Sequence, residues 1–219
     1  EDELQRDKAV LKDLLSRGLF RALSVNFDSQ YKWNCKKIEY LLSLCDFSGI
    51  DANYSENGKT YLHYIHNAES LNVLIAAGLD TRLPVHKGII FELIKKPNKI
   101  DIIRRLVEND KDLVHELNDS LTPMIRCCYW LRDYGVQAYF PLMEIFYQNG
   151  ADINYAEKSG HTIASICAGR DQLDQLKVIV EDWGASLIVP EGIKNPLTTA
   201  KQWNRPNTTA YLEEIYQQR

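Results

Sequence analysis

Apolar residues recur at helical spacing in four separate stretches of the chain. They lie three or four positions apart with polar residues between them, which is typical of an amphipathic helix that buries one face. We therefore predict an all-α fold in which each stretch is the second helix of a pair. The apolar positions of the four stretches are Leu71, Val73, Leu74 and Ile75; Ile102, Ile103, Leu106 and Val107; Leu142, Ile145 and Phe146; and Leu176, Val178, Ile179 and Val180.

Short turn phrases rich in glycine, aspartate and asparagine follow the helical stretches. A glycine just after the last apolar position of a helix is a signal for its C-terminal end. The first residues of the five phrases are 29, 32, 40 and 34 positions apart, and a period near ~33 residues indicates stacked supersecondary units. The phrases occupy residues 49–53, 78–80, 110–112, 150–154 and 184–186.

Each predicted pair begins with a polar turn followed by a threonine. Asn-Gly and Ser-Gly turns supply the positive backbone φ that a tight turn needs. The threonine hydroxyl can cap the short first helix that follows, and Pro123 sits in a first turn, where a missing N–H donor is tolerated. The starts lie at residues 57–63, 119–124, 159–164 and 195–200, and residues 87–91 must serve for a repeat without this turn.

The starts and the closing phrases together resemble the ankyrin repeat. The segment Gly58-Lys-Thr-Tyr-Leu-His63 is similar to the family's opening Gly-x-Thr-Pro-Leu-His and departs from it only by Tyr61. The segment Gly150-Ala-Asp-Ile-Asn154 is similar to its closing Gly-Ala-Asp-x-Asn. The resemblance covers residues 17–218 and implies an ankyrin-type solenoid of stacked helix-turn-helix repeats with short turn or hairpin connections.

The expected organisation is a single ankyrin-repeat domain over residues 1–219. Residues 1–18 form an N-terminal helix that closes at Arg17 and Gly18, and residues 195–219 form a C-terminal capping pair with helices over 200–203 and 209–216. Residues 19–194 hold about five divergent repeats, the first with helices over 19–25 and 33–44. The repeat between Ser120 and Gly150 carries about seven extra residues within 129–140 relative to the ankyrin pattern.

Composition narrows the classes of partner. The 26 basic and 30 acidic residues give a formal charge of −4, which argues against nucleic acid or an anionic membrane surface as partner. No apolar run approaches the ~20 residues of a membrane span, so no membrane insertion is expected. Five irregularly spaced cysteines fit reduced thiols, and hence the cytoplasm, better than a disulfide framework.

The cysteines offer two candidate reactive sites. The vicinal pair Cys127-Cys128 suggests redox or metal chemistry, but packing is the favoured interpretation. Counted from the repeat starts, this pair and Cys167-Ala168 fall where the ankyrin first helix carries paired alanines, and a small, weakly polar side chain suits that contact. Cys35 could be a nucleophile with a distant histidine, yet no local motif of a thiol enzyme surrounds it.

Two further patterns suggest a metal or nucleotide site. His63 and His66 lie three positions apart on a predicted helix and could hold zinc with a carboxylate or thiol, but no third ligand lies at motif spacing. The phrase Arg-Asp-Tyr-Gly at 132–135 is similar to kinase phrases, but no glycine-rich phosphate loop accompanies it. We therefore expect no active site, no metal, no cofactor and no enzymatic activity in this chain.

Aromatic residues concentrate in the extended repeat, between Arg126 and Phe140. They either fill a widened gap between helices or line an exposed ledge, and tyrosine, tryptophan and arginine dominate interface energies. The ankyrin resemblance adds the turn tips and inner helix face of the concave side, where that family binds its partners. The expected partner-binding residues are Asn57, Lys59, Tyr64, Leu121, Arg126, Tyr129, Trp130, Tyr134, Tyr139, His161 and Arg170.

The predicted function is protein–protein interaction by a rigid monomeric scaffold, which loses little ordering entropy when it binds a partner protein. An alternative is a targeting or regulatory domain of a larger effector enzyme whose catalytic domain lies outside the chain, since the sequence starts at Glu1 rather than Met. The degenerate repeats also resemble the ankyrin proteins of intracellular bacterial pathogens and protists. That resemblance implies a secreted effector that binds a host protein in the host cytoplasm.

Overall fold

The computed structural model describes residues 2–25, 51–65 and 67–218, in two compact units that divide between Asn109 and Asp110. Helices dominate both units, which confirms the predicted all-α class. Within the described ranges, the only named strands are β1 (Ser55–Glu56) and β2 (Lys59–Thr60), which pair as an antiparallel hairpin. No helix in this part of the chain is long and apolar enough to cross a lipid bilayer.

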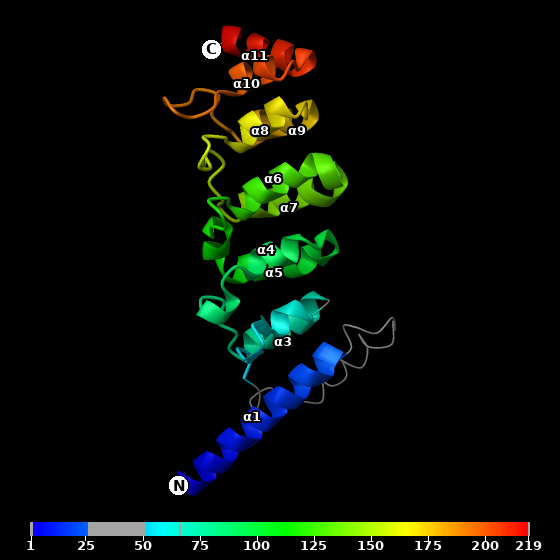
Figure 1. The fold of residues 1–219 in the computed structure, drawn as a ribbon, viewed down its shortest axis with the longest axis vertical. Helices are drawn as coiled ribbons and strands as arrows, with labels where there is room; N and C mark the ends of the chain where they lie inside the picture. Colours follow the sequence, from blue (N-terminus) through cyan, green and yellow to red (C-terminus); the bar gives the residue numbers. More distant parts are fainter. Residues whose placement is uncertain (1, 26–50, 66, 219) are drawn as a thin grey trace. The chain divides into compact units, whose positions relative to one another are not determined.

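The N-terminal unit begins with one long helix, α1 (Asp2–Val25). The prediction that a helix closes at Gly18 and a second begins at residue 19 was wrong, because α1 runs through this position without a break (Figure 1). Glycine inside a helix costs only about 1 kcal/mol relative to alanine, and burial of Leu19 and Phe20 favours continuation. The predicted helix over 33–44 lies outside the described residues.

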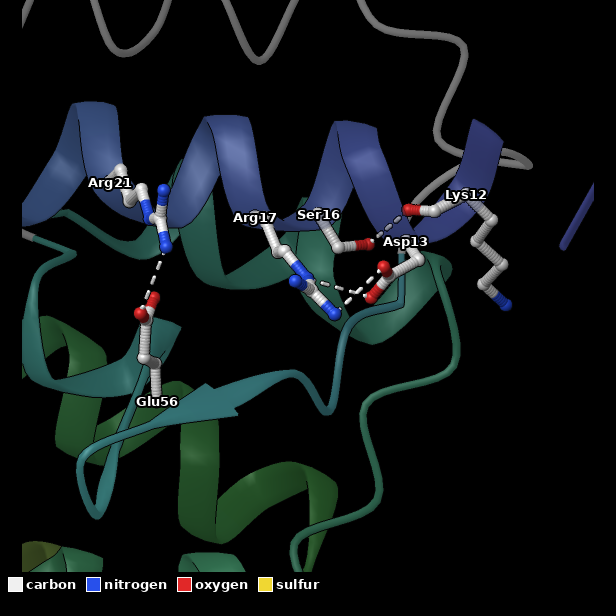
Figure 2. A network of polar contacts seen from close by, with 6 residues as sticks. All are labelled: Lys12, Asp13, Ser16, Arg17, Arg21 and Glu56. Atoms are coloured by element: carbon white, nitrogen blue, oxygen red, sulfur yellow. Dashed lines mark hydrogen bonds and ion pairs between the residues drawn. The ribbon is translucent and has the colours of Figure 1, made fainter. Parts of the chain in front are cut away.

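Polar contacts join α1 to the segment that follows the undescribed stretch. The buried hydroxyl of Ser16 donates to the carbonyl of Lys12 at 2.7 Å and accepts the N–H of Asp51 at 2.9 Å. Figure 2 shows Arg21 reaching from α1 to Glu56 of the hairpin, with 3.3 Å between Nη2 and Oε1. These bonds place the hairpin against the helix surface on which Phe20 is buried.

The first predicted start is a hairpin followed by a single 3-10 turn. Asn57 and Gly58 both have positive φ, as a two-residue hairpin turn requires. Thr60 then opens η2 (Tyr61–His63), where its N–H donates to Nδ1 of His63 at 3.0 Å. The helix predicted here is therefore only three residues long. It is held by aromatic contacts, since Phe20 meets the rings of Tyr61 and Tyr64 edge-on.

Three α-helices follow the hairpin in the N-terminal unit: α3 (Ala68–Ala76), α4 (Ile89–Ile94) and α5 (Ile100–Asn109). Asn67 caps α3 by accepting the N–H of Ser70 at 2.8 Å. The short 3-10 segments η3 (Pro84–His86) and η4 (Pro97–Lys99) lie between the helices. The apolar positions predicted for α5 are all buried, and α5 packs against both α3 and α4.

The C-terminal unit consists of the 3-10 segment η5 (Lys111–His115) and three successive helix pairs (Figure 1). The pairs are α6 (Pro123–Tyr134) with α7 (Val136–Gln148), α8 (Ile163–Gly169) with α9 (Leu173–Lys177), and α10 (Pro196–Gln202) with α11 (Pro206–Gln218). A π-helical stretch, η6 (Val178–Asp182), continues α9. Gly135 alone links α6 to α7, so the extra residues predicted at 129–140 lengthen two helices rather than form a loop.

The predicted threonine caps are present at α6 and α8, and predicted closing turns occur in both units. Thr122 and Thr162 each accept a backbone N–H at 3.3 Å, at the N-termini of α6 and α8. Gly78, Gly150 and Gly184 have positive φ just after α3, α7 and η6, where a residue with a Cβ would be strained. At the fourth predicted start the cap is Asn195, which accepts the N–H groups of Leu197 and Thr198.

Hydrogen bonds join equivalent turns of successive repeats. The Oδ1 atom of Asn53 accepts the N–H of Asp80 at 2.8 Å, and the Oδ1 atom of Asn154 accepts the N–H of Ser186 at the same distance. The bonded residues are 27 and 32 positions apart. At these two places, the last position of one closing phrase binds the closing phrase that follows it in the chain.

Candidate functional site

The C-terminal unit contains a cavity of about 220 Å³ between the first helices of its three pairs. Helix α6 contributes two residues of the lining, and helix α8 contributes Ser165, Ile166 and Gly169. The start of α8 and the end of α10 complete the lining. We call this site the arginine cavity; it is lined by Tyr129, Arg132, His161, Ser165, Ile166, Gly169, Arg170, Thr199, Trp203 and Arg205.

Close packing of α8 on α10 forms the floor of the cavity. A Cβ atom on Gly169 would lie 3.0 Å from Cγ2 of Thr199 and 3.4 Å from Cδ1 of Trp203. Such contacts are tighter than ordinary van der Waals separation. The absence of a side chain at Gly169 therefore lets the two helices approach and brings Trp203 beside Ile166 in the lining.

Two of the three cavity arginines are held in place by backbone carbonyl groups. Arg170 donates through Nη1 to the carbonyl of Tyr129, and its guanidinium carbon lies 5.1 Å from the centre of the Tyr129 ring. Its Nη1 also lies 3.7 Å from a carboxylate oxygen of Asp133. Arg205 donates through Nε to the carbonyl of Gly169 at 2.9 Å. Both side chains therefore stabilise contacts between neighbouring repeats.

The third arginine, Arg132, is exposed and makes no hydrogen bond or ion pair with the described residues. The lining includes no carboxylate, and Asp133, outside the lining, pairs with Arg170, so the positive charge at the rim rests on Arg132 and Arg205. His161 adds little to that charge near neutral pH, because burial lowers its pKa and outweighs the opposing effect of Glu157. Its Nδ1 lies 3.2 Å from the hydroxyl of Ser165.

Trp203 is the largest exposed group at the cavity, with 58% of its surface accessible. Neither Trp203 nor Arg205 is among the binding residues predicted from the sequence. A partial positional signal was available, because Trp203 lies eight residues after the N-cap Asn195, as Arg170 lies eight residues after the N-cap Thr162; the same count from Thr122 reaches Trp130, which does not line the cavity.

The predicted aromatic ledge is divided between the core and the surface. Trp130 meets Tyr134 and Tyr139 edge-on, with ring centres 6.0 and 5.4 Å away. Tyr134 is 66% exposed, but Tyr139 is only 4% exposed, so Tyr139 fills space between α6 and α7. The guanidinium of Arg126 lies 6.0 Å from the Trp130 ring. This group lies outside the arginine cavity and forms a separate aromatic cluster.

Three other predicted residues of the C-terminal unit, Leu121, His161 and Arg170, lie outside the aromatic cluster. Leu121 is half-buried in an isolated bridge with Asn118, before the start of α6. His161 and Arg170, by contrast, meet Tyr129 at the arginine cavity. The predicted binding residues of the C-terminal unit thus lie at more than one place, some in the arginine cavity and others in the aromatic cluster.

The remaining predicted residues belong to the N-terminal unit. Asn57 is exposed at the hairpin tip. The ammonium of Lys59 lies 5.7 Å from the centre of the Tyr64 ring, and Tyr64 itself is 7% exposed. Both residues line a second cavity of about 170 Å³. We call it the lysine cavity, since its lining also includes Lys95, Lys96 and Lys99.

Lys99 is the most perturbed group of the lysine cavity. Its Nζ donates to the carbonyl of Ile65 at 2.8 Å, and the side chain is almost entirely buried. Burial, assisted by the nearby charge of Lys96, lowers the pKa of Lys99 to about 8. Glu92 supplies the one carboxylate among the lining residues, and it pairs with Lys95 at 2.6 Å.

The candidate thiol and histidine sites do not assemble into a reactive centre in the described residues. Cys127, Cys128 and Cys167 are fully buried, which confirms the packing interpretation, and burial raises the pKa values of Cys127 and Cys128. Residues 35 and 66 lie outside the described ranges. His63 is occupied with the N–H and hydroxyl of Thr60, and no cluster of three potential metal-ligating side chains occurs in the part of the chain that the structure covers.

No protein-family model matches the chain, and no curated protein matches it significantly.

Proposed function

We propose that this chain is an ankyrin-type repeat module that binds a partner protein through the surface around the arginine cavity. The observation that carries the proposal is the exposed indole of Trp203, beside an apolar cavity with an arginine rim. Protein-binding hot spots are enriched in tryptophan, tyrosine and arginine and centre on such pockets. The cavity offers all three residue types, from three successive repeats.

The repeat architecture supports a recognition role. Threonine or asparagine caps, positive-φ glycines and hydrogen bonds between successive closing turns recur along both units. Arg170 and Arg205 each bond a backbone carbonyl of the preceding repeat. A surface held in this way is preorganised, and little conformational entropy is lost when a partner binds.

The size of the arginine cavity favours a protein ligand over a cofactor. Pockets that enclose drug-sized molecules typically measure roughly 300–1,000 Å³, whereas this cavity measures about 220 Å³. A volume below that range suits one inserted side chain. The rest of a partner would then contact the rim, where Tyr129, Trp203 and the arginines lie.

Affinity capture with single-residue variants tests the proposal. Tagged full-length chain and its Trp203→Ala variant are used to capture proteins from lysate, followed by mass spectrometry. A hot-spot tryptophan is worth about 2 kcal/mol or more, so we expect capture of the specific partner to fall at least about tenfold.

Leu117→Ala is the matched control, because Leu117 is exposed and apolar but lies outside the cavity lining. Tyr134→Ala separates the arginine cavity from the aromatic cluster. If Trp203→Ala retains its circular dichroism spectrum and captures the same partner equally well, the cavity is not the binding site.

A further inference from the structure

We propose that the arginine cavity binds a linear acidic segment of the partner protein. An apolar side chain of that segment enters the cavity, and carboxylates beside it pair with Arg132 and Arg205. This inference rests on the proposed function and specifies the chemistry of the ligand.

The charge at the rim points to a carboxylate ligand. The chain as a whole is acidic, with a formal charge of −4, yet three arginines and no carboxylate line this cavity. The positive charge is therefore a local feature rather than a reflection of composition. Because arginine presents a planar fork of N–H donors, it pairs with a carboxylate through two parallel hydrogen bonds.

The three arginines differ in how many of their N–H donors are free to bind a ligand. Arg170 is already engaged with the carbonyl of Tyr129 and lies near the carboxylate of Asp133. Arg205 uses Nε for the carbonyl of Gly169, and its guanidinium has four further N–H donors. Arg132 has no hydrogen-bond or ion-pair partner among the described residues. Arg132 and Arg205 are therefore the two available anchors.

The interior of the cavity favours an apolar side chain next to the acidic residues of the ligand. Ile166, Gly169 and Thr199 are small or apolar groups of the lining, which also includes the rings of Tyr129 and Trp203. The Ser165 hydroxyl, also in the lining, already donates its hydrogen to the carbonyl of Thr162, so it has no hydrogen left to donate to a ligand. An aliphatic or aromatic side chain would lose only water contacts on entering, whereas a polar one placed against Ile166, Gly169 and the Thr199 methyl would lose hydrogen bonds that these three groups cannot replace.

The experiment is selection from a random peptide library displayed on phage, with the immobilised full-length chain as the target. We expect enriched peptides to carry aspartate or glutamate on one or both sides of an aliphatic or aromatic residue. The best peptide is then synthesised in two forms, one acidic and one with glutamine and asparagine in place of its carboxylates. Binding of both forms is measured by calorimetry at low and at high salt.

Two variants and one control test whether Arg132 and Arg205 bind the carboxylates of the peptide. Arg132→Gln removes an exposed side chain without described partners, and we expect it to weaken binding of the acidic peptide about tenfold while leaving the amide form unchanged. Arg205→Lys keeps the positive charge but loses the fork, and we expect an intermediate loss. Arg104→Gln, an exposed position on α5, is the control and should bind as the wild type does.

The outcomes separate this inference from the proposed function. Acidic peptides that lose affinity on Arg132→Gln and in high salt support it. Neutral or basic peptides whose binding is lost on Trp203→Ala overturn the acidic ligand but leave the cavity as a protein-binding site. Failure to enrich any peptide that Arg132→Gln or Trp203→Ala weakens overturns the linear acidic segment, and the capture experiment with Trp203→Ala then decides the proposed function independently.

Discussion

The buried thiols show how tertiary packing determines the chemistry of single residues. The Sγ atoms of Cys128 and Cys167 lie 3.5 Å apart, on α6 and α8, although the residues are 39 positions apart in the chain. Two thiols this close could in principle form a disulfide, but their reactivity also depends on the pKa of the thiol. Burial raises the pKa of Cys128, and the hydrogen bond with Cys167 raises it further, so the nucleophilic thiolate is scarce.

We accordingly expect Cys127, Cys128 and Cys167 to resist alkylation in the native protein. Iodoacetamide labelling, followed by peptide mass spectrometry at each site, should show modification only at the rate of unfolding. Addition of urea should release all three sites together. Rapid labelling of Cys128 in the absence of denaturant would contradict the packing role.

The buried side chain of Lys99 makes the stability of the folded protein depend on pH. Its folded-state pKa of about 8 lies below the ordinary value of 10.5. Between these two values the unfolded chain holds the proton that the folded chain has released, so stability rises with pH through that window. Below about pH 8 both states are protonated, and the full cost of burying the ammonium remains.

We expect the wild type to gain stability relative to Lys99→Met between about pH 8 and about pH 10. Urea denaturation of both proteins at each pH measures the difference, which cancels titrations common to them. Lys87→Met, which removes an exposed lysine from the same unit, controls for the loss of a charge. A constant difference across this range would mean that the Lys99 ammonium is not desolvated in the folded protein.

At the scale of elements, glycines determine where each repeat turns. Gly150 closes α7 with φ +92°, and a Cβ there would meet no atom within 4 Å. Gly160 precedes α8 with φ +85°, and a Cβ there would lie 2.5 Å from the carbonyl oxygen of Gly192. The carbonyl of Gly160 also accepts the N–H of Lys194 at 2.7 Å. The two glycines thus share a backbone conformation but differ in their surroundings.

Alanine substitutions separate these two effects. Gly150→Ala should destabilise the protein by about 1–2 kcal/mol, the cost of a left-handed conformation for a residue with a Cβ. Gly160→Ala should cost more than Gly150→Ala, because the segment around Gly192 must also move. Chemical denaturation of both variants measures the difference, and equal costs would show that this segment yields freely.

At the scale of the whole molecule, two compact units each have an internal network of contacts. In the C-terminal unit, α6 packs on α8, α8 packs on α10, and each first helix contacts its own second helix. Trp183 is stacked on Phe140 and Tyr147 of α7, with ring centres 5.3 and 4.8 Å away. These contacts all join elements within residues 110–219.

We therefore expect residues 110–219 to fold when expressed alone. A chain of this length can bury enough apolar surface for a stable core, and the contacts described above lie within it. The fragment should give a helical far-ultraviolet circular dichroism spectrum and a cooperative urea transition. A spectrum typical of an unfolded chain would show that this unit depends on residues that precede it.

The sequence determined the helical class, the amphipathic stretches and several of the turns that end them, whereas the helices predicted at 200–203 and 209–216 are longer, Pro196–Gln202 and Pro206–Gln218. These features depend on short-range physics: Thr122 and Thr162 cap the helices that begin beside them, and Gly78, Gly150 and Gly184 end helices through their own backbone freedom. Of the predicted site residues, Tyr129, His161 and Arg170 do line one cavity. The prediction placed them on the turn tips and inner helix face of neighbouring helix pairs, and they come from α6 and from the two ends of α8.

Only the tertiary structure decided which neighbours each side chain meets. Packing of Leu19 and Phe20 carries α1 through Gly18, and the junction of α6 with α7 buries Tyr139 instead of exposing it. The missing Cβ of Gly169 brings Trp203 to the cavity, and the carbonyl of the same residue positions Arg205. These outcomes depend on contacts between residues about one repeat apart or on the fit of two helices. Local propensity carries no information about such contacts, because the same side chain is stable in a core or at a surface according to what packs against it.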